Sequence, residues 1–366
     1  MMTFDPLRPP PLLTADLPGI GGRIKTVPED FEVEEIPAYE PSGEGDFLYL
    51  WIEKRDMGAE YFTRQVARRL GIPPGEVGTA GLKDRRAVTR QMVSVPIGYA
   101  DRVDALNGDG IRVLQTHRHS NKLKPGHLRG NRFRILIRDT AADPAPLLEP
   151  ILRRLREDGM PNFYGPQRFG RDGETLRLGL ALLRKEPPPT PASGRRPNLR
   201  SPFLRKLALS AAQAGLFNHY LARRLADGLL RRVLPGDVMA KWPFGGLFVA
   251  DDVPREQERF DRRETVSAGP MFGRKTFAAA GVAAEREEAV LVEAGLTRAA
   301  FLGFGKLLQG TRRHNLIYID GQDATVTPDG VNLTFMLPAG SYATVLLREV
   351  MKRELADDGF FEESEP

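Results

Sequence analysis

The chain has 366 residues, of which 41% are hydrophobic and 28% charged, a composition typical of globular proteins and a length that allows two domains. No apolar run approaches the roughly 20 residues of a membrane span, and the start of the chain lacks the basic and apolar regions of a secretion signal, so we expect a soluble cytoplasmic protein. Cysteine is absent, which excludes disulfides, thiolate zinc sites and thiol nucleophiles.

The first half of the chain is predicted to combine strands with two helices. Residues 21–36 alternate apolar and polar side chains around a Pro-Glu-Asp turn, which predicts a hairpin or strand pair. Residues 45–56 carry apolar side chains on both faces, which predicts a central strand covered on both sides. Residues 59–71 have helical spacing and end in glycine. Two further strands and a second helix are expected at residues 91–96, 131–139 and 147–159.

A break in composition separates the two halves. Residues 187–202 are rich in proline, glycine, serine and arginine, which is incompatible with a helix or strand interior and predicts a domain boundary. Long helical patterns follow at residues 207–230 and 284–295. Strand patterns then return at residues 315–338, and residues 341–355 predict a helix capped by Ser341.

The return of strand patterns after the helical region predicts a discontinuous first domain. We expect this domain to comprise residues 1–187 and 316–366, with a second domain of mixed character, residues 188–315, inserted between its strands. The expected fold class is α+β, because strands and helices do not alternate regularly.

Basic residues gather in three segments, residues 83–90, 117–134 and 194–206. Together with the net charge of +5, this uneven distribution indicates a surface for the phosphates of a nucleic acid. The histidines of the second segment stand among lysines and arginines without an accompanying carboxylate, so we expect no metal site. No phosphate-binding loop or dinucleotide fingerprint is present, and we expect no cofactor.

Asp84 lies inside the first basic segment, in the sequence GTAGLKDRRAVTRQ (residues 78–91). Clustered charges usually form ordinary exposed faces, so the residues alone leave a solvated loop as an alternative to a catalytic carboxylate. The neighbouring cations would hold RNA phosphates and favour an anionic carboxylate, as a nucleophile or base requires.

The sequence AGLKDRRAVTRQ closely resembles the motif that carries the catalytic aspartate in the TruD family of pseudouridine synthases. Four further segments resemble that family in the same order, at residues 25–35, 117–133, 161–170 and 337–349. Residues 209–218 and 310–313 resemble parts of the insertion characteristic of the family. The resemblance implies a pseudouridine synthase-like catalytic domain with a mixed, mainly antiparallel sheet, and an inserted α/β TRUD domain.

The resemblance also implies roles for individual residues. Asp84 would be the catalytic aspartate, and Lys25 and Phe31 would line the uridine pocket. Asn162 would contact the uracil, since an amide matches the donor and acceptor edge of that base. Tyr164 and Tyr342 stand where the family generally has phenylalanine and would stack on or lie beside the base. The residues expected to contact the RNA backbone are Lys83, Arg85, Arg86, Lys122, Lys124, Arg312 and Arg313.

Three of these positions have a plainer interpretation from residue type alone. A lysine beside a Pro-Glu-Asp turn is usually just exposed, phenylalanine is more often a core residue than a ligand contact, and an asparagine after Pro161 is often a turn former. Only the resemblance favours a functional role for Lys25, Phe31 and Asn162.

The implied function is the isomerisation of uridine to pseudouridine in tRNA, with position 13 as the expected target and a monomer as the expected state. Another tRNA position, another RNA, a non-catalytic tRNA-binding protein of the same fold and the hydrolysis of a nucleoside stay open as alternatives. The sequence also leaves open whether Asp84 attacks C1′, adds to the uracil ring or removes the 2′ proton.

Overall fold

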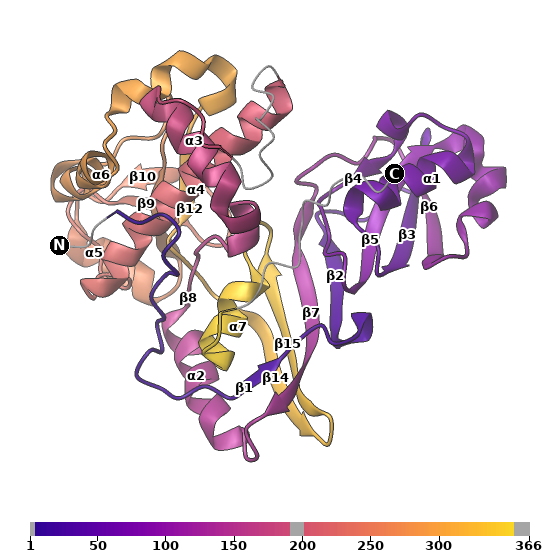
Figure 1. Ribbon diagram of the computed structural model, residues 1–366, viewed down its shortest axis with the longest axis horizontal. Helices are drawn as coiled ribbons and strands as arrows, with labels where there is room; N and C mark the ends of the chain where they lie inside the picture. Colours follow the sequence, from indigo (N-terminus) through magenta and orange to yellow (C-terminus); the bar gives the residue numbers. More distant parts are fainter. Residues whose placement is uncertain (1–3, 191–200, 355–366) are drawn as a thin grey trace.

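The computed structural model describes residues 4–190 and 201–354 and is organised around a nine-stranded sheet (Figure 1). Seven strands form the path β14-β15-β7-β2-β5-β3-β6, while β1 pairs with β7 and β4 with β5. Among the described strands of this sheet, only β2 and β5 pair in parallel, so the expected mixed, mainly antiparallel sheet is confirmed. The strands are β1 (Gly21–Arg23), β2 (Phe31–Pro37), β3 (Phe47–Arg55), β4 (Gly78–Thr79), β5 (Val88–Pro96), β6 (Ile111–His119), β7 (Leu128–Thr140), β14 (Asp320–Thr327) and β15 (Gly330–Pro338).

Different helices cover the two halves of this sheet. Helix α1 (Ala59–Leu70) presents Phe62, Val66 and Leu70 to β3 and β5, and it ends at Gly71 in the left-handed conformation, as its spacing and glycine predict. Helices α2 (Ala145–Asp158) and α7 (Ala343–Met351) bury their apolar faces against β7 and β15. The two halves therefore have separate apolar cores, joined where β2 lies between β5 and β7 (Figure 1).

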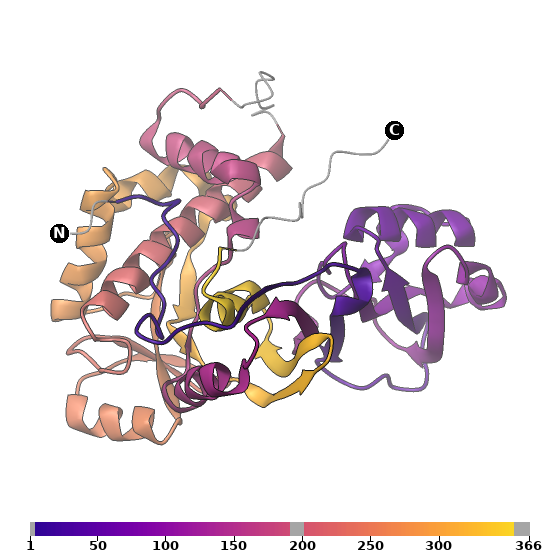
Figure 2. The ribbon, with the colours of Figure 1, turned by 60° about the horizontal axis from the view of Figure 1, so that its bottom comes forward.

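The N-terminal segment binds α7 from outside. Both the backbone N–H and the hydroxyl of Thr14 donate to the carboxylate of Glu349, at 3.0 and 2.6 Å, and the N–H of Leu13 donates to the same group at 2.7 Å. This segment runs over the body of the molecule before it enters the sheet (Figure 2). It thereby fixes the helix whose N-terminal cap is Tyr342.

The middle of the chain forms a second body with its own four-stranded antiparallel sheet, in the order β10-β9-β11-β12. Its strands are β9 (Val238–Lys241), β10 (Leu247–Val249), β11 (Thr265–Met271) and β12 (Thr311–His314), and its helices are α4 (Pro202–Ala226), α5 (Val253–Asp261) and α6 (Gly281–Glu293). Helix α3 (Glu174–Arg184) packs on α4. A two-stranded sheet of β8 (Met160–Pro161) and β13 (Leu316–Ile317) joins this body to the larger one.

Short 3-10 helices complete the described secondary structure. They are η1 (Pro28–Asp30), η2 (Pro74–Glu76), η3 (Ile97–Leu106), η4 (Pro166–Arg168), η5 (Arg171–Gly173) and η6 (Arg298–Leu308). No helix within residues 4–190 and 201–354 is long and apolar enough to cross a membrane. Most of the expected boundary at residues 187–202 lies outside the described residues, and the division into domains stays a prediction.

Two expectations about local structure are wrong. The strands on either side of the Pro-Glu-Asp turn do not form a hairpin, because β1 and β2 both pair with β7. Ser341 does not cap α7, which has Tyr342 at its N-cap position; the Ser341 hydroxyl instead contacts the Asn162 amide oxygen at 3.3 Å. In both places long-range pairing prevails over a local sequence pattern.

The contact between α3 and α4 depends on Gly179. A Cβ atom added at this position would lie 1.9 Å from the backbone oxygen of Ala208, a distance that requires the helices to move apart. We predict that Gly179→Ala lowers the free energy of unfolding by about 1–3 kcal/mol, as overpacking typically does. Urea denaturation of both proteins measures the difference. Gly98→Ala is the control, because nothing lies within 4 Å of the Cβ it would add; equal stability of the two variants would contradict the prediction.

Candidate active site

Asp84 lies on the loop between β4 and β5 and is 22% exposed at its side chain. Its Oδ1 is 3.1 Å from the Nζ of Lys25. The same Nζ lies 4.5 Å from the centre of the Phe31 ring. The structure therefore brings together three of the residues expected in the uridine pocket, as a carboxylate, a cation and an aromatic ring in contact.

The turn that carries Lys25 is held by buried polar contacts. Lys25 itself has a positive φ of 55°, a conformation that non-glycine residues adopt only when their surroundings impose it. Asp30, which is 1% exposed, accepts hydrogen bonds from the N–H of Val27 at 3.1 Å and from Nη2 of Arg138 at 2.7 Å. Burial opposes ionisation of Asp30, but these hydrogen bonds outweigh it and keep the pKa of the carboxyl below its usual value.

Phe31 is buried in the main core and also contacts Lys25. The residue is 2% exposed, and its ring lies 6.2 Å from that of Phe133 in the main core. The ring also contacts the ammonium of Lys25. Phe31 is thus a core residue whose ring packs against Lys25, the partner of Asp84. Its contact with a base remains a prediction.

The backbone of the Asp84 loop is held by a buried lysine that the sequence analysis did not identify. Lys54 of β3 is fully buried, and its Nζ donates to the carbonyl oxygens of Asp84 and Met57, at 2.8 and 2.5 Å. Burial lowers the pKa of the Lys54 ammonium to about 8. A lysine inside a strand gives no local sequence signal that distinguishes this role from an exposed position.

Lys83 has a structural position that does not fit the expected contact with RNA phosphates. It is 4% exposed, and its Nζ lies 2.6 Å from Oε2 of the buried Glu35. Its side chain points into the molecule, toward β2. This expectation is corrected: Lys83 anchors the loop.

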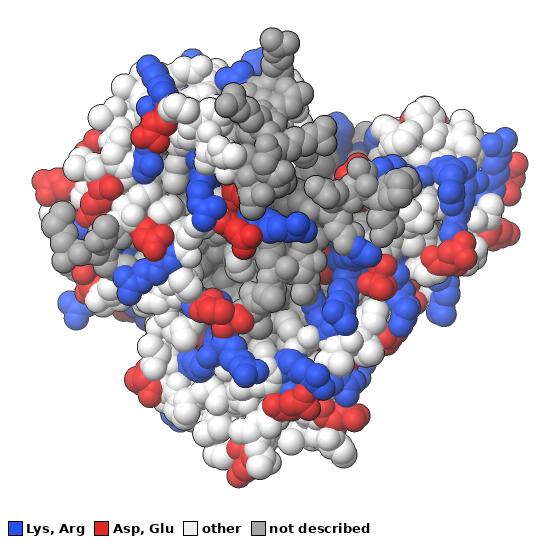
Figure 3. All heavy atoms as spheres, viewed as in Figure 1, with Lys and Arg blue, Asp and Glu red and all other residues white. Residues whose placement is uncertain are grey.

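The other basic residues expected to contact RNA from this half of the molecule lie at the surface. Arg86 is exposed and donates to the carbonyl of Thr26 at 3.1 Å, while Arg85 is half-buried. Lys124 is exposed, and Lys122 donates to the carbonyl of Gly75. The segment that contains Lys122 and Lys124 lies beside the Asp84 loop, because the N–H of Gly126 donates to the carbonyl of Ala80 at 2.8 Å. On the face shown in Figure 3, basic side chains border the region between the left and right lobes of the molecule, and acidic side chains lie among them.

A second group of predicted pocket residues lies where the second body, formed by the middle of the chain and called the insertion below, meets the larger one. The rings of Tyr164 and Tyr342 are 5.6 Å apart at an angle of 62°. Asn162, two residues before Tyr164, is 5% exposed. The two groups are connected through the sheet, since Phe31 begins β2, β2 pairs with β7, and β7 pairs with β15, which leads to Tyr342.

Arg313 belongs to this second group. Its Nε donates to the carbonyl of Asn162 at 2.9 Å, and its Nη2 donates to the amide oxygen of the same residue at 2.7 Å. Its guanidinium carbon lies 4.0 Å from the centre of the Tyr164 ring. The expected role in binding the RNA backbone is therefore not the role that these contacts favour, because the guanidinium is occupied by pocket residues.

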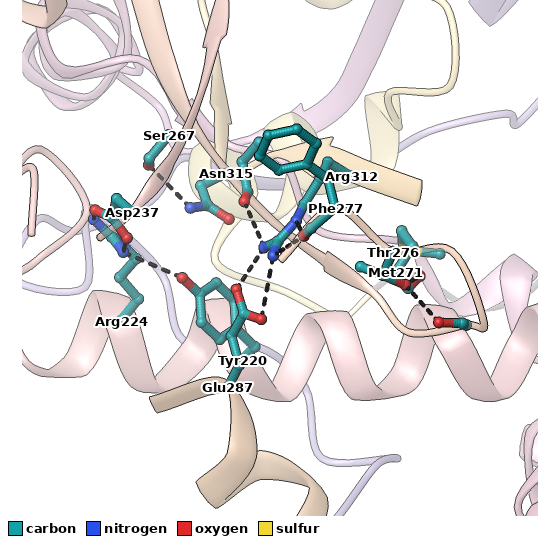
Figure 4. Close-up of polar contacts among 12 residues, drawn as sticks. Tyr220, Arg224, Asp237, Ser267, Met271, Thr276, Phe277, Glu287, Arg312 and Asn315 are labelled. Atoms are coloured by element: carbon teal, nitrogen blue, oxygen red, sulfur yellow. Dashed lines mark hydrogen bonds and ion pairs between the residues drawn. The ribbon is translucent and has the colours of Figure 1, made fainter. Parts of the chain in front are cut away.

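Arg312 also occupies a structural position. Its side chain is 1% exposed and forms an ion pair of 2.5 Å with Glu287 of α6 (Figure 4). The guanidinium also donates to the carbonyl of Phe277. Burial raises the pKa of the Glu287 carboxyl, although Arg312 acts in the opposite direction. The expectation that Arg312 contacts RNA is corrected, because its donors are used inside the insertion.

Known proteins resemble this chain over nearly its whole length. The family model described as tRNA pseudouridine synthase D (TruD) matches residues 11–189 and 199–350. A tRNA pseudouridine synthase D from Anaeromyxobacter sp. (strain Fw109-5) is 45% identical, with 93% of this chain and 96% of the relative covered. One from Thermus thermophilus is 44% identical, with 95% of this chain and 93% of the relative covered.

A solved structure agrees with this assignment. The crystal structure of a putative tRNA pseudouridine synthase D from Methanosarcina mazei has a TM-score of 0.73 and 26% identity, and the match covers 94% of this chain and 96% of that one. The fold is therefore shared over most of both chains. From the family match and these relatives we conclude that the chain belongs to the TruD family of tRNA pseudouridine synthases.

Proposed function

We propose that this chain, a tRNA pseudouridine synthase by its family, acts on position 13 of tRNA and uses Asp84 as its catalytic carboxylate. The observation that supports Asp84 most strongly is its pairing with Lys25 at 3.1 Å, on a loop whose backbone is held from inside. A partly exposed carboxylate, fixed in direction beside a cation, suits a group that reacts with a substrate.

The reaction requires one bond to break and another to form. The bond between C1′ and N1 of the nucleotide breaks, the uracil turns, and C1′ bonds to C5. C5 then loses its proton to solvent, and N1 gains a proton. The atoms balance without a redox partner or a transferred group, so we propose neither cofactor nor metal. Asp84 would act as a nucleophile at C1′, as a nucleophile at the ring, or as the base that removes the 2′ proton, and each role requires the anionic carboxylate.

The detached base must be held while it turns. We assign this function to Tyr164 and Tyr342, whose rings meet near the end of β15, and to Asn162 as the polar contact of the uracil. Lys25 would keep the carboxylate of Asp84 in place during the rotation.

Phosphate binding is assigned to four residues near the Asp84 loop, namely Arg85, Arg86, Lys122 and Lys124. We further propose that the enzyme acts as a cytoplasmic monomer. The main alternative is a uridine at another position of tRNA or in another RNA, since folded RNA is recognised largely by shape and phosphates.

The role of Asp84 is tested by Asp84→Asn. Asparagine keeps the size of the side chain but cannot act as an anionic nucleophile or base, so we predict less than about a hundredth of the wild-type rate with tRNA affinity nearly unchanged. Single-turnover tritium release from C5-labelled tRNA and filter binding measure the two quantities. Asp143→Asn, at an exposed site on another loop, is the control. A higher residual rate of Asp84→Asn would reject the assignment.

Tyr164 is predicted to act through its ring alone. Its hydroxyl contacts the sulfur of Met271 at 3.6 Å, a weak interaction. Tyr164→Phe should therefore keep most of the activity, whereas Tyr164→Ala should lose stacking worth about 1–3 kcal/mol. Single-turnover rates at saturating tRNA distinguish the two. If the phenylalanine variant is as slow as the alanine variant, the hydroxyl has a chemical role.

Phosphate contacts of Lys122 and Lys124 are tested by salt dependence. Each lysine that binds one phosphate adds about one unit to the slope of the logarithm of affinity against the logarithm of salt concentration. The double variant Lys122→Ala/Lys124→Ala should lower this slope by about 2. Filter binding across a salt series measures it, and an unchanged slope would show that these lysines do not bind phosphates.

A further inference from the structure

The amide of Asn162 contacts a guanidinium, a hydroxyl and a backbone carbonyl. Its Oδ1 accepts from Nη2 of Arg313 at 2.7 Å and lies 3.3 Å from the hydroxyl of Ser341. Its Nδ2 donates to the carbonyl of His314 at 3.0 Å. The backbone of Asn162 is held as well, because its N–H donates to the carbonyl of Asn315 at 2.9 Å and its carbonyl accepts from Arg313.

These partners allow a single orientation of the amide. A guanidinium only donates hydrogen bonds, and a carbonyl oxygen only accepts them. Turning the amide by 180° would place its NH₂ group against the guanidinium of Arg313 and its oxygen against the carbonyl of His314. The Nδ2 group has two hydrogens, and one of them has no protein partner within the described part of the chain.

Arg313 is itself held in place by the insertion. The preceding residue, Arg312, pairs with Glu287, and Asn315, two residues after Arg313, donates to Ser267 of β11 at 2.9 Å (Figure 4). The guanidinium of Arg313 also donates to the carbonyl of Gly340 at 2.8 Å, in the turn that leads to Tyr342. One side chain from β12 thus contacts three parts of the second pocket group, namely Asn162, Tyr164 and this turn.

We propose that Arg313 determines which base the pocket accepts, by locking the Asn162 amide so that it offers an N–H donor and no acceptor to the substrate. The inference rests on the proposed function in one respect, the contact between Asn162 and the base. It differs from the expectation that this amide matches both a donor and an acceptor of uracil, because both sides of its oxygen are occupied within the protein.

The chemical consequence concerns one carbonyl group of the uracil. An N–H donor at position 4 bonds to O4 of uracil but is repelled by the amino group that cytosine carries there, whereas a donor at O2 positions the base without separating uracil from cytosine. In a buried site, a donor without an acceptor costs enough to reject the wrong base. Arg313 therefore acts as a positioning residue for recognition, and the insertion supplies it.

The test uses tRNA with uridine, 2-thiouridine or 4-thiouridine at the target position, because sulfur accepts hydrogen bonds more weakly than oxygen. Single-turnover rates and tRNA affinities are measured for the wild type, Arg313→Met and Asn162→Ala. Arg255→Met, which removes one exposed arginine from α5, is the control for charge. Circular dichroism melts check that each variant is folded.

We expect one of the two thio substitutions to slow the wild type by about tenfold. Arg313→Met should slow the uridine reaction by a similar factor and leave tRNA affinity within about twofold. It should also remove most of the slowing caused by the thio substitution (the thio penalty), because the amide of Asn162 is then free to turn. The proposal would be overturned if Arg313→Met reacted with uridine as fast as the wild type and was slowed by the thio substitution to the same extent. Weaker tRNA binding with a salt slope lower by about one and an unchanged thio penalty would also overturn it, because this is the result for a phosphate contact.

Failure of the proposed function has a different signature. If Asn162→Ala is as fast as the wild type, Asn162 does not contact the base, and the pocket assignment is wrong. If Asn162→Ala is slow and Arg313→Met is not, only the role of Arg313 is wrong.

Discussion

The position of the Asp84 loop depends on two lysines that solvent barely reaches. Lys54 donates to the backbone oxygen of Asp84, and Lys83 pairs with the buried Glu35. Burying a cation is costly unless its donors are satisfied, so these contacts tie the loop tightly to β2 and β3. Asp84 is left facing outward between them, where Lys25 fixes its carboxylate. The basic segment of residues 83–90 thus contains an internal anchor, Lys83, as well as surface residues such as Arg86.

The second body contributes directly to the group of residues around Asn162 and Tyr164. Its strand β12 is anchored by the buried Arg312–Glu287 pair, and the adjacent Arg313 reaches Asn162 and the Tyr164 ring. The strand pair β8–β13 joins the same two bodies next to this contact. Residues that are distant in sequence therefore come into contact around Asn162 and Tyr164.

Much of the fold was predictable because its patterns are local. The spacing of Phe62, Val66 and Leu70 and the terminal Gly71 define α1, and the apolar pattern of residues 131–139 lies within β7. The partners of β1 and β2 were not predictable, because strand pairing depends on contacts across the whole chain. The same limit applies to the site: the motif resemblance selected Lys25 and Asp84, but burial alone distinguishes Lys83 from Arg86, and sequence does not report burial for charged residues.

The most direct test of the proposed function is to incubate the enzyme with total unmodified tRNA and map pseudouridine at nucleotide resolution while assaying for free uracil. Isomerisation within a closed pocket predicts pseudouridine at position 13 of the tRNAs that carry uridine there, with no uracil released. Pseudouridine confined to other positions would contradict the assigned target. Release of uracil would contradict the isomerisation itself, because it would mean that the base leaves the pocket before C1′ bonds to C5.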